Sequence, residues 1–137
     1  MSSIPEPPAP KTVLVVDDDQ DMCWVLEGAL ASLGCAVTAV GLGQSAISVV
    51  KENAFPVALV DARLPDMDGL RLIRELRALR PSMRIIMISG YFLEDDVRIL
   101  EAVRTAEIDA FLAKPFQIEA IVAAALGKVN GTRRPTN

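Results

Sequence analysis

The chain has 137 residues, of which 51% are hydrophobic and 23% are charged, as expected for a single globular domain. It contains no histidine, which excludes serine–histidine–aspartate hydrolysis, histidine-ligated metals and a phosphohistidine acceptor within this chain. The net charge of −4 argues against a broad nucleic-acid surface, and no apolar run reaches the ~18 residues that a membrane span needs.

The two ends of the chain differ in composition from its middle. Residues 1–10 hold four of the nine prolines, which favours an extended segment outside the fold, and they lack the apolar region of a secretory signal. Residues 130–137 are polar and indicate a tail or the start of a linker. We therefore expect a folded domain over 11–129, located in the cytoplasm. Cys23 and Cys35 form no CxxC motif, and we expect two reduced, packed thiols.

The middle of the chain alternates short apolar runs with helical patterns. Continuous β-branched runs such as VLVV predict strands that are buried on both faces. In chain order, the predicted elements are a strand at 13–16, a helix at about 20–33 ended by Gly34, a weaker strand at 36–40, a helix at 44–53, a strand at 57–60, a helix at about 68–79, a strand at 85–88, a helix at about 93–105, a strand at 110–113 and a last helix over 118–129.

Apolar residues at helical spacing predict the buried face of each longer helix. The predicted inward residues are Met22, Val25, Leu26, Ala29, Leu30 and Leu33; then Leu72, Ile73, Leu76 and Leu79; then Leu93, Val97, Leu100 and Val103; then Ile118, Ile121, Val122, Ala125, Leu126 and Val129. Trp24 lies opposite the first of these stripes. It marks either a contact surface or a partly shielded aromatic on the outside of its helix.

Five strands that alternate with five helices predict an α/β fold. Each strand–helix–strand unit is a right-handed crossover, so the sheet is parallel and carries helices on both faces. In such a doubly wound sheet the functional crevice lies at the carboxyl ends of the strands. The residues that directly follow the predicted strands are therefore the candidate site.

Acidic and polar residues follow four of the five strands. Asp17, Asp18 and Asp19 follow the first strand, and Asp61 follows the third. Ser89 follows the fourth strand and Lys114 the fifth. Because parallel strands bring these positions to one edge, the carboxylates repel one another unless a cation is present. Hard oxygen ligands at an open edge suit Mg²⁺, and the hydroxyl and the lysine provide a place for a phosphoryl group. This chemistry suggests phosphoryl transfer onto Asp61 as the nucleophile.

Four segments, VLVVDDDQ, LVDARLPDMDGL, MISG and FLAKPF, together resemble the receiver domain of bacterial two-component response regulators. The resemblance covers roughly residues 12–128, and the segment DMCWVLEGAL is most similar to receivers of enhancer-binding transcription regulators. It implies a flavodoxin-like sheet with strand order 2-1-3-4-5. The chain departs from the family at Glu107 and Ile108, where Gly-Ala usually ends the preceding helix.

The resemblance implies how the acidic residues share their work. Asp61 matches the aspartate that accepts the phosphoryl group. Asp18 and Asp61 match the direct Mg²⁺ ligands, together with the backbone carbonyl of Arg63, and Asp17 matches the acid that acts through a water. Asp19 is expected to start the first helix instead.

Three further positions match residues that hold or sense the phosphoryl group. Lys114 matches the lysine that pairs with it, and Ser89 matches the hydroxyl that turns to hold one of its oxygens. Phe111 matches the aromatic switch position, although a strand residue facing the core is the simplest interpretation of it.

The resemblance also implies the partners. A sensor histidine kinase donates the phosphoryl group and is expected to dock on Trp24, Phe116 and Gln117, beside the acidic edge. Phosphorylation is expected to change the surface formed by the helix at 93–105, the strand at 110–113 and the last helix, and this surface is also the candidate for a homodimer. The domain is then a signalling switch that catalyses only its own phosphorylation and dephosphorylation, with no direct contact to nucleic acid or membrane.

Two other functions fit parts of this pattern of residues. A small-molecule phosphatase with an aspartyl-phosphate intermediate usually has a second acid two residues after the nucleophile, where this chain has Arg63, and it needs a cap segment that is absent here. A binding module that works without phosphorylation would share the fold, but the complete set of site residues argues against it. The sequence leaves open the cognate kinase, the output, and whether the domain stands alone or belongs to a longer regulator.

Overall fold

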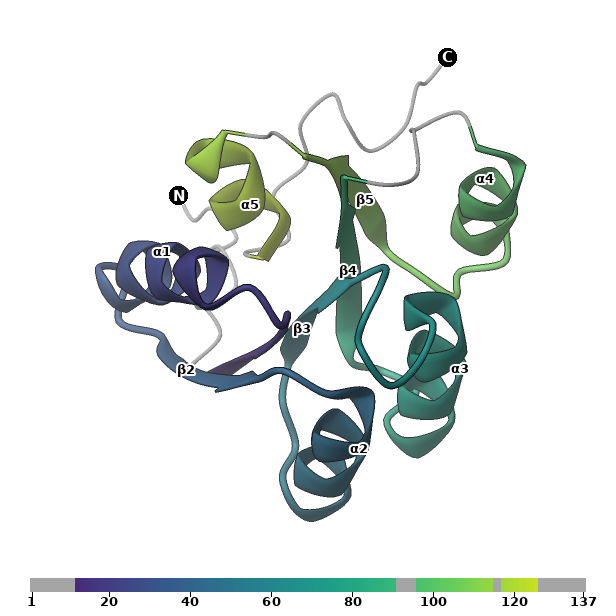
Figure 1. Ribbon diagram of the computed structural model, residues 1–137, viewed down its shortest axis with the longest axis horizontal. Coiled ribbons are helices and arrows are strands. Elements are labelled where there is room, and N and C mark those ends of the chain that lie inside the picture. The colour runs from purple at the N-terminus through teal and green to yellow at the C-terminus, as the bar shows by residue number, and fades with distance from the viewer. Residues whose placement is uncertain (1–11, 91–95, 115–116, 126–137) are drawn as a thin grey trace, which may run out of the picture.

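The computed structural model describes residues 12–90, 96–114 and 117–125, and its five strands form one parallel sheet in the order β2-β1-β3-β4-β5 (Figure 1). The fold class and strand order are those predicted. The elements are β1 (Thr12–Val16), α1 (Gln20–Ala31), β2 (Ala36–Val40), α2 (Gly43–Glu52), β3 (Val57–Asp61), α3 (Gly69–Leu79), β4 (Arg84–Ser89), α4 (Val97–Arg104), β5 (Ala110–Ala113) and α5 (Ile118–Ala125).

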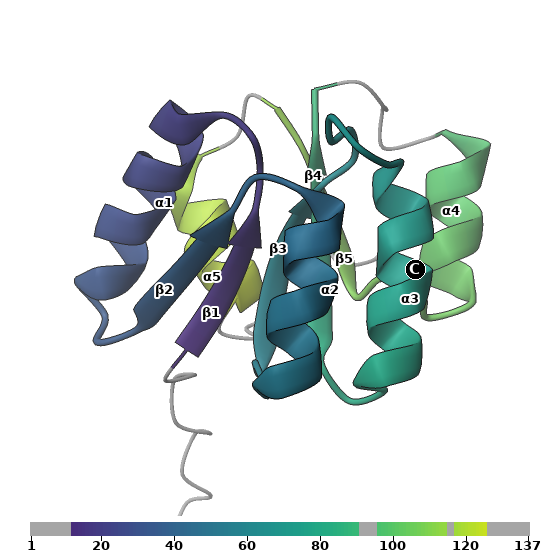
Figure 2. The ribbon, with the colours of Figure 1, turned by 60° about the horizontal axis from the view of Figure 1, so that its bottom comes forward.

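Helices cover both faces of the sheet. Helices α1 and α5 lie on one face, and α2, α3 and α4 lie on the other (Figure 2). Alternate residues of the central strands point to opposite sides, so Leu14 and Val16 pack toward α2 and α3, while Val13 and Val15 pack toward α1 and α5. None of the helices within the described ranges is long and apolar enough to cross a membrane.

The first helix ends as predicted at Gly34. The backbone N–H of Cys35 donates to the carbonyl of Leu30 at 3.1 Å, and that of Gly34 donates to the carbonyl of Ala31 at 2.9 Å. This pair of hydrogen bonds is a Schellman motif, and its turn residue needs the left-handed backbone that Gly34 adopts with φ +86°. The buried contact between Leu30 and Cys35 completes the motif.

Some of the predicted inward positions are wrong. Val25, Leu33 and Leu79 are 40%, 42% and 36% exposed. Leu33 lies beyond the end of α1 and Leu79 is the last residue of α3, so the periodicity extends the buried faces of these helices too far. Leu93, Leu126 and Val129 lie outside the described residues.

Helix α4 is shorter than predicted and turned differently. It begins after Asp96, whose side chain accepts a hydrogen bond from the N–H of Arg98 at 2.9 Å. The predicted inward residues Val97, Leu100 and Val103 are 78%, 54% and 41% exposed. The core is instead filled by the residues Ile99 and Ala102. This short helix has apolar residues on two faces, and packing against α3 and β5 selects the one that the periodicity did not favour.

The end of α4 repeats the motif seen after α1, but without a glycine. The N–H of Glu107 donates to the carbonyl of Ala102 at 2.9 Å, and the N–H of Ala106 donates to that of Val103 at 3.1 Å. Ala106 therefore occupies the left-handed position, with φ +64°. A side chain in this conformation is strained by about 1 kcal/mol.

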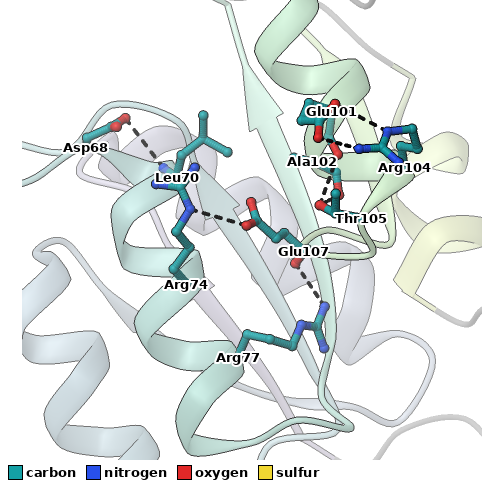
Figure 3. A network of polar contacts seen from close by, with 9 residues as sticks. All are labelled: Asp68, Leu70, Arg74, Arg77, Glu101, Ala102, Arg104, Thr105 and Glu107. Carbon is teal, nitrogen blue, oxygen red and sulfur yellow. Dashed lines mark hydrogen bonds and ion pairs between the residues drawn. The ribbon is translucent and has the colours of Figure 1, made fainter.

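The two residues that depart from the family pattern hold this turn against α3. Glu107 forms an ion pair with Arg74 at 3.3 Å, and its carbonyl accepts from Arg77 Nη2 at 3.0 Å (Figure 3). Arg77 also pairs with Asp109 at 3.0 Å. Ile108 is buried in the core. The sequence departure is thus accommodated by a polar network between α3 and the start of β5.

The two helix ends allow a reciprocal stability test. We expect Ala106→Gly to stabilise the fold by about 0.5–1 kcal/mol, because glycine adopts positive φ without strain. Gly34→Ala should destabilise it by about 1 kcal/mol, since a Cβ there meets nothing within 4 Å and only the backbone strain counts. Urea unfolding measures both. Ala78→Gly, in the exposed part of α3, is the control and should destabilise by about 1 kcal/mol. If Ala106→Gly and Ala78→Gly changed the free energy of unfolding in the same direction, the left-handed conformation of Ala106 would be contradicted.

Candidate functional site

The carboxyl ends of the strands bring the predicted site residues together along one edge of the sheet, the upper edge in Figure 2. Val16 at the end of β1 is in register with Val60, so Asp17 and Asp61 are the next residues on two adjacent strands. Asp61 is in register with Ile88 of β4, and Ser89 is in register with Ala113 of β5, directly before Lys114.

Three carboxylates form a cluster at this edge. One oxygen from each of Asp17, Asp18 and Asp61 lies within 4.8 Å of the other two. The side chain of Asp17 is fully buried and that of Asp61 is 13% exposed, whereas Asp18 is open to solvent. This acidic cluster (Asp17, Asp18 and Asp61) is therefore closed on the protein side and accessible from one direction.

Lys114 faces the acidic cluster from the next strand but one. Its Nζ lies 3.5 Å from Asp17 Oδ2 and 3.7 Å from Asp61 Oδ2. The N–H of Lys114 donates to the carbonyl of Ser89 at 2.7 Å, which fixes the start of its side chain to the end of β4. The lysine bridges two acids from β1 and β3 and offsets part of their repulsion.

The buried position of Asp17 disfavours the charged form of its carboxyl group. Burial raises its pKa from an ordinary value near 3.8 to about 6, and the neighbouring Asp61 acts in the same direction. The hydrogen bond from the N–H of Asp19, at 3.0 Å, and the charge of Lys114 oppose this shift. Oδ2 of Asp17 accepts no hydrogen bond from any described residue, although it is buried.

This donor set fits a divalent cation. A buried carboxylate oxygen without a hydrogen-bond donor is costly, and a cation beside it would supply the missing partner. The cluster offers hard oxygen atoms from three residues, with one side open for water or a substrate oxygen, as Mg²⁺ and Ca²⁺ sites require.

Asp19 stays apart from the cluster, as expected. Its side chain accepts hydrogen bonds from the N–H groups of Asp21 and Met22, at 3.0 and 3.2 Å, and so caps α1. The start of α1 is further tied to the edge by Cys23, whose thiol donates to the carbonyl of Asp17 at 3.2 Å. Burial raises the pKa of this thiol, which keeps it protonated, and Cys35 is a second free, buried thiol.

The two predicted switch residues lie close behind the site. Ser89 is the last residue of β4 and is buried. Phe111, on β5, is in register with Met87 of β4. It is half-buried and packs against the core beneath α3 and α4. Both side chains are thus placed between the acidic edge and the α4 side of the molecule.

Arg63 begins the loop from β3 to α3. Its N–H donates to Asp61 Oδ1 at 3.2 Å, and it forms a bridge with Asp68 across the loop. Sequence reasoning missed another residue of this loop, Asp66, whose carboxylate bonds to the first turn of α2. No linear pattern signals that contact, because its partners lie 22 and 23 positions earlier in the chain.

The residues predicted to meet a kinase lie on neighbouring elements. Trp24 is 76% exposed on the outer face of α1, as its spacing predicts. Gln117 is exposed directly before α5, and α5 packs beside α1. Phe116 lies outside the described residues.

Comparison with known proteins identifies the family. The model of the response regulator receiver domain matches residues 13–126. The transcriptional regulatory protein ZraR of Escherichia coli K12 is 32% identical over 111 residues, which are 81% of this chain and 24% of that protein. The DNA-binding transcriptional regulator NtrC of Salmonella typhimurium is 32% identical over 128 residues, which are 91% of this chain and 27% of that protein.

A solved structure gives the same result. It is a response regulator protein from Burkholderia pseudomallei with a phosphorylated aspartic acid, a calcium ion and citrate. Its TM-score is 0.75 at 30% identity, over 84% of this chain and 66% of that chain. The chain belongs to the response regulator receiver domains, the signalling switches of two-component systems. It spans about a quarter of the length of the two curated relatives named above.

The raised pKa of Asp17 makes a prediction about stability and pH in the absence of metal. Between pH 3.8 and about 6 the folded chain holds a proton on Asp17 that the unfolded chain has lost, so this group favours folding less as the pH rises. Asp17→Asn keeps the acceptor for the Asp19 N–H and removes the titration. We therefore expect the variant to gain stability relative to wild type between pH 4 and pH 7, by up to about 3 kcal/mol at ~1.4 kcal/mol per pKa unit.

Urea unfolding in the presence of a chelator, at pH 4, 5, 6 and 7, measures this difference. Comparing the two chains at each pH cancels the titration of groups that do not interact with Asp17. A difference that stays constant over this range would show that Asp17 titrates alike in the folded and unfolded states.

Proposed function

We propose that this chain accepts a phosphoryl group on Asp61 from the phosphohistidine of a sensor histidine kinase, in a reaction that depends on Mg²⁺. The observation that carries this proposal is the acidic cluster within 4.8 Å, with Lys114 opposite it. An aspartate in such a setting can attack phosphorus, because the Asp61 side chain is partly exposed and Lys114 Nζ lies 3.7 Å from its Oδ2.

The acidic cluster would hold the metal. Asp18 and Asp61 would be direct ligands together with the carbonyl of Arg63, and Asp17 would act through a water. Mg²⁺ in this position supplies charge neutralisation between the carboxylates and the phosphoryl oxygens. A likeness supports this assignment: the Burkholderia pseudomallei relative carries both a phosphorylated aspartic acid and a calcium ion.

The residues of the chain itself divide the remaining work. Lys114 pairs with a phosphoryl oxygen in exchange for its contact with Asp61. The hydroxyl of Ser89 turns toward a second oxygen, and Phe111 moves into the space behind it. Ser89 is the last residue of β4 and Phe111 lies in β5 opposite Met87, both on the sheet face that α4 covers, so a change at Asp61 is passed to that helix.

Helix α4 supports the proposed output surface. This helix carries an exposed apolar stripe of Val97, Leu100 and Val103. Exposed apolar patches of this kind are typical of protein interaction surfaces. We propose that the α4–β5–α5 surface carries the output and is the candidate interface of a homodimer. ZraR and NtrC are regulators of transcription, and by analogy with them we propose that the output of this domain is the control of transcription.

The direct test is labelling with a small phosphodonor. Wild type, incubated with acetyl phosphate and Mg²⁺, should gain one phosphoryl group in the peptide that contains Asp61, detected by intact-mass and peptide mass spectrometry. Asp61→Asn should not be labelled, and without metal it should be folded and slightly more stable than wild type, because one charge of the acidic cluster is gone. Lys114→Ala should fold and lose most labelling.

Two outcomes would contradict the proposal. Labelling that persists in Asp61→Asn would move the acceptor elsewhere. No labelling of the folded wild type, with or without Mg²⁺, would favour the alternative of a binding module that works without phosphorylation.

Kinase docking is tested separately, with two donors. Trp24→Ala should slow phosphotransfer from the cognate kinase about tenfold or more. A tryptophan that a partner covers on binding often contributes a large part of the binding energy of an interface. Labelling by acetyl phosphate should stay close to that of wild type, because this donor needs no docking surface. Gln117→Ala should show the same pattern more weakly. An equal loss with both donors would mean that Trp24 supports the site and is not a docking residue.

A further inference from the structure

Residues 41–44, which form the turn after β2 and the first two residues of α2, contact both sides of the acidic cluster. On one side they meet the backbone that carries Asp17 and Asp18. On the other they meet the loop from β3 to α3, which carries Arg63. None of their side chains belongs to the proposed metal site, so any effect of this turn on the site is one of positioning.

The contact with the β3–α3 loop is a helix cap supplied by a distant residue. The residue before α2, Leu42, has no side-chain cap of its own. Instead Asp66 accepts hydrogen bonds from the N–H of Gly43 at 2.8 Å and from that of Gln44 at 3.0 Å, one with each oxygen. The hydrogen bond from the N–H of Gln44 and, to a smaller extent, that from Gly43 lower the pKa of Asp66. The capping group is therefore the charged carboxylate.

A close apolar contact lies beside this cap. The side chain of Met67 covers Gly43 so closely that a Cβ there would lie 2.5 Å from its Cγ and 2.6 Å from its Sδ. A side chain at position 43 would have to displace the side chain of Met67. The cap and the contact together fix the loop to α2 at two successive residues.

The other side of the turn touches the first acids. The carbonyl of Val40 accepts from the N–H of Asp17 at 3.0 Å. A Cβ at Gly41 would lie 3.6 Å from the Cα of Asp18, which is van der Waals contact. The position of the turn relative to β1 is therefore set directly at the two residues that begin the acidic cluster.

The β3–α3 loop is short and is closed by its own backbone hydrogen bonds. The N–H of Leu64 donates to the carbonyl of Met67 at 3.2 Å, and that of Gly69 donates to the carbonyl of Ala62 at 2.8 Å. With Asp66 fixed to α2, the carbonyl of Arg63 has little freedom. Release of Asp66 would free the half of the loop that carries this carbonyl.

We infer that Asp66, through its cap on Gly43 and Gln44, is a positioning residue that sets the affinity of the acidic cluster for its divalent ion. The inference rests on the proposed metal site. It assigns to α2, which contributes no ligand, the role of holding the Arg63 carbonyl at a fixed place relative to Asp17 and Asp18. Because coupling is reciprocal, the bound ion should also steady the first turn of α2.

The test is calorimetric titration of MgCl₂ into three variants and wild type. Asp66→Ala should weaken binding about tenfold. Asp66→Asn keeps one acceptor oxygen and should lose about threefold, so it partly rescues the affinity and also serves if Asp66→Ala fails to fold. Asp96→Ala is the matched control, because Asp96 likewise caps a helix with its carboxylate, accepting from Arg98 at 2.9 Å, but does not belong to the loop that carries Arg63. It should bind Mg²⁺ as wild type does.

Amide hydrogen exchange gives a readout that does not depend on activity. In wild type, Mg²⁺ should slow exchange at the N–H groups of Gly43 and Gln44. In Asp66→Ala these amides should exchange faster and should not respond to the ion. A purely structural role of the cap would speed their exchange without changing the Mg²⁺ affinity.

The outcomes distinguish a failure of the proposed metal site from a failure of the positioning role of Asp66. If wild type binds no Mg²⁺, the proposed metal site fails and this inference fails with it. If wild type binds the ion and Asp66→Ala binds it equally well, only the positioning role is overturned. Equal losses in Asp66→Ala and Asp66→Asn would overturn it too, because they would show that the charge of Asp66 acts through space.

Discussion

The structure is organised around a repulsion between carboxylates at one edge of its sheet. Parallel strands must end on the same side, so the acids that follow β1 and β3 are forced together whatever their mutual repulsion. Asp17 is buried there with an oxygen that accepts no hydrogen bond within the described part of the chain, and Lys114 offsets the charge only in part, across 3.5 Å. The apolar residues beneath the edge hold the strands in place against this repulsion. A cation or a phosphoryl group can therefore change the energy of the whole domain by binding at one point.

The surroundings of the acidic cluster transmit and limit that change. Toward β4 and β5, Ser89 and Phe111 lead from the site to α4, which has a small buried face and an exposed apolar one. The turn after this helix is held by the Arg74–Glu107 ion pair. On the opposite side, α2 is fixed by Asp66 and Met67. The site thus lies between α4, which buries only a small face, and α2, which Asp66 and Met67 hold.

The strands, the fold class and the acidic cluster could be predicted from the sequence, because each depends on local runs and on the rule that parallel strands share an edge. Gly34 and Asp19 were also predictable, since helix ends follow local chemistry. The buried face of α4 was not, because apolar residues lie on both of its faces and only packing selects Ile99 and Ala102. The left-handed Ala106 and the cap from Asp66 were missed for a related reason: nothing in the residue itself signals a conformation or a partner that tertiary contacts impose.

The central claim is that the fold holds its acidic cluster under repulsion which a divalent ion relieves. The most direct measurement is the free energy of urea unfolding at pH 7.5 as a function of Mg²⁺ concentration, for wild type and for a chain in which both Asp18 and Asp61 are asparagine. The account predicts that wild type gains ~2.7 kcal/mol when Mg²⁺ reaches a hundredfold excess over its Kd, while the double variant does not respond. A wild-type unfolding curve that is the same in chelator and in millimolar Mg²⁺ would contradict it.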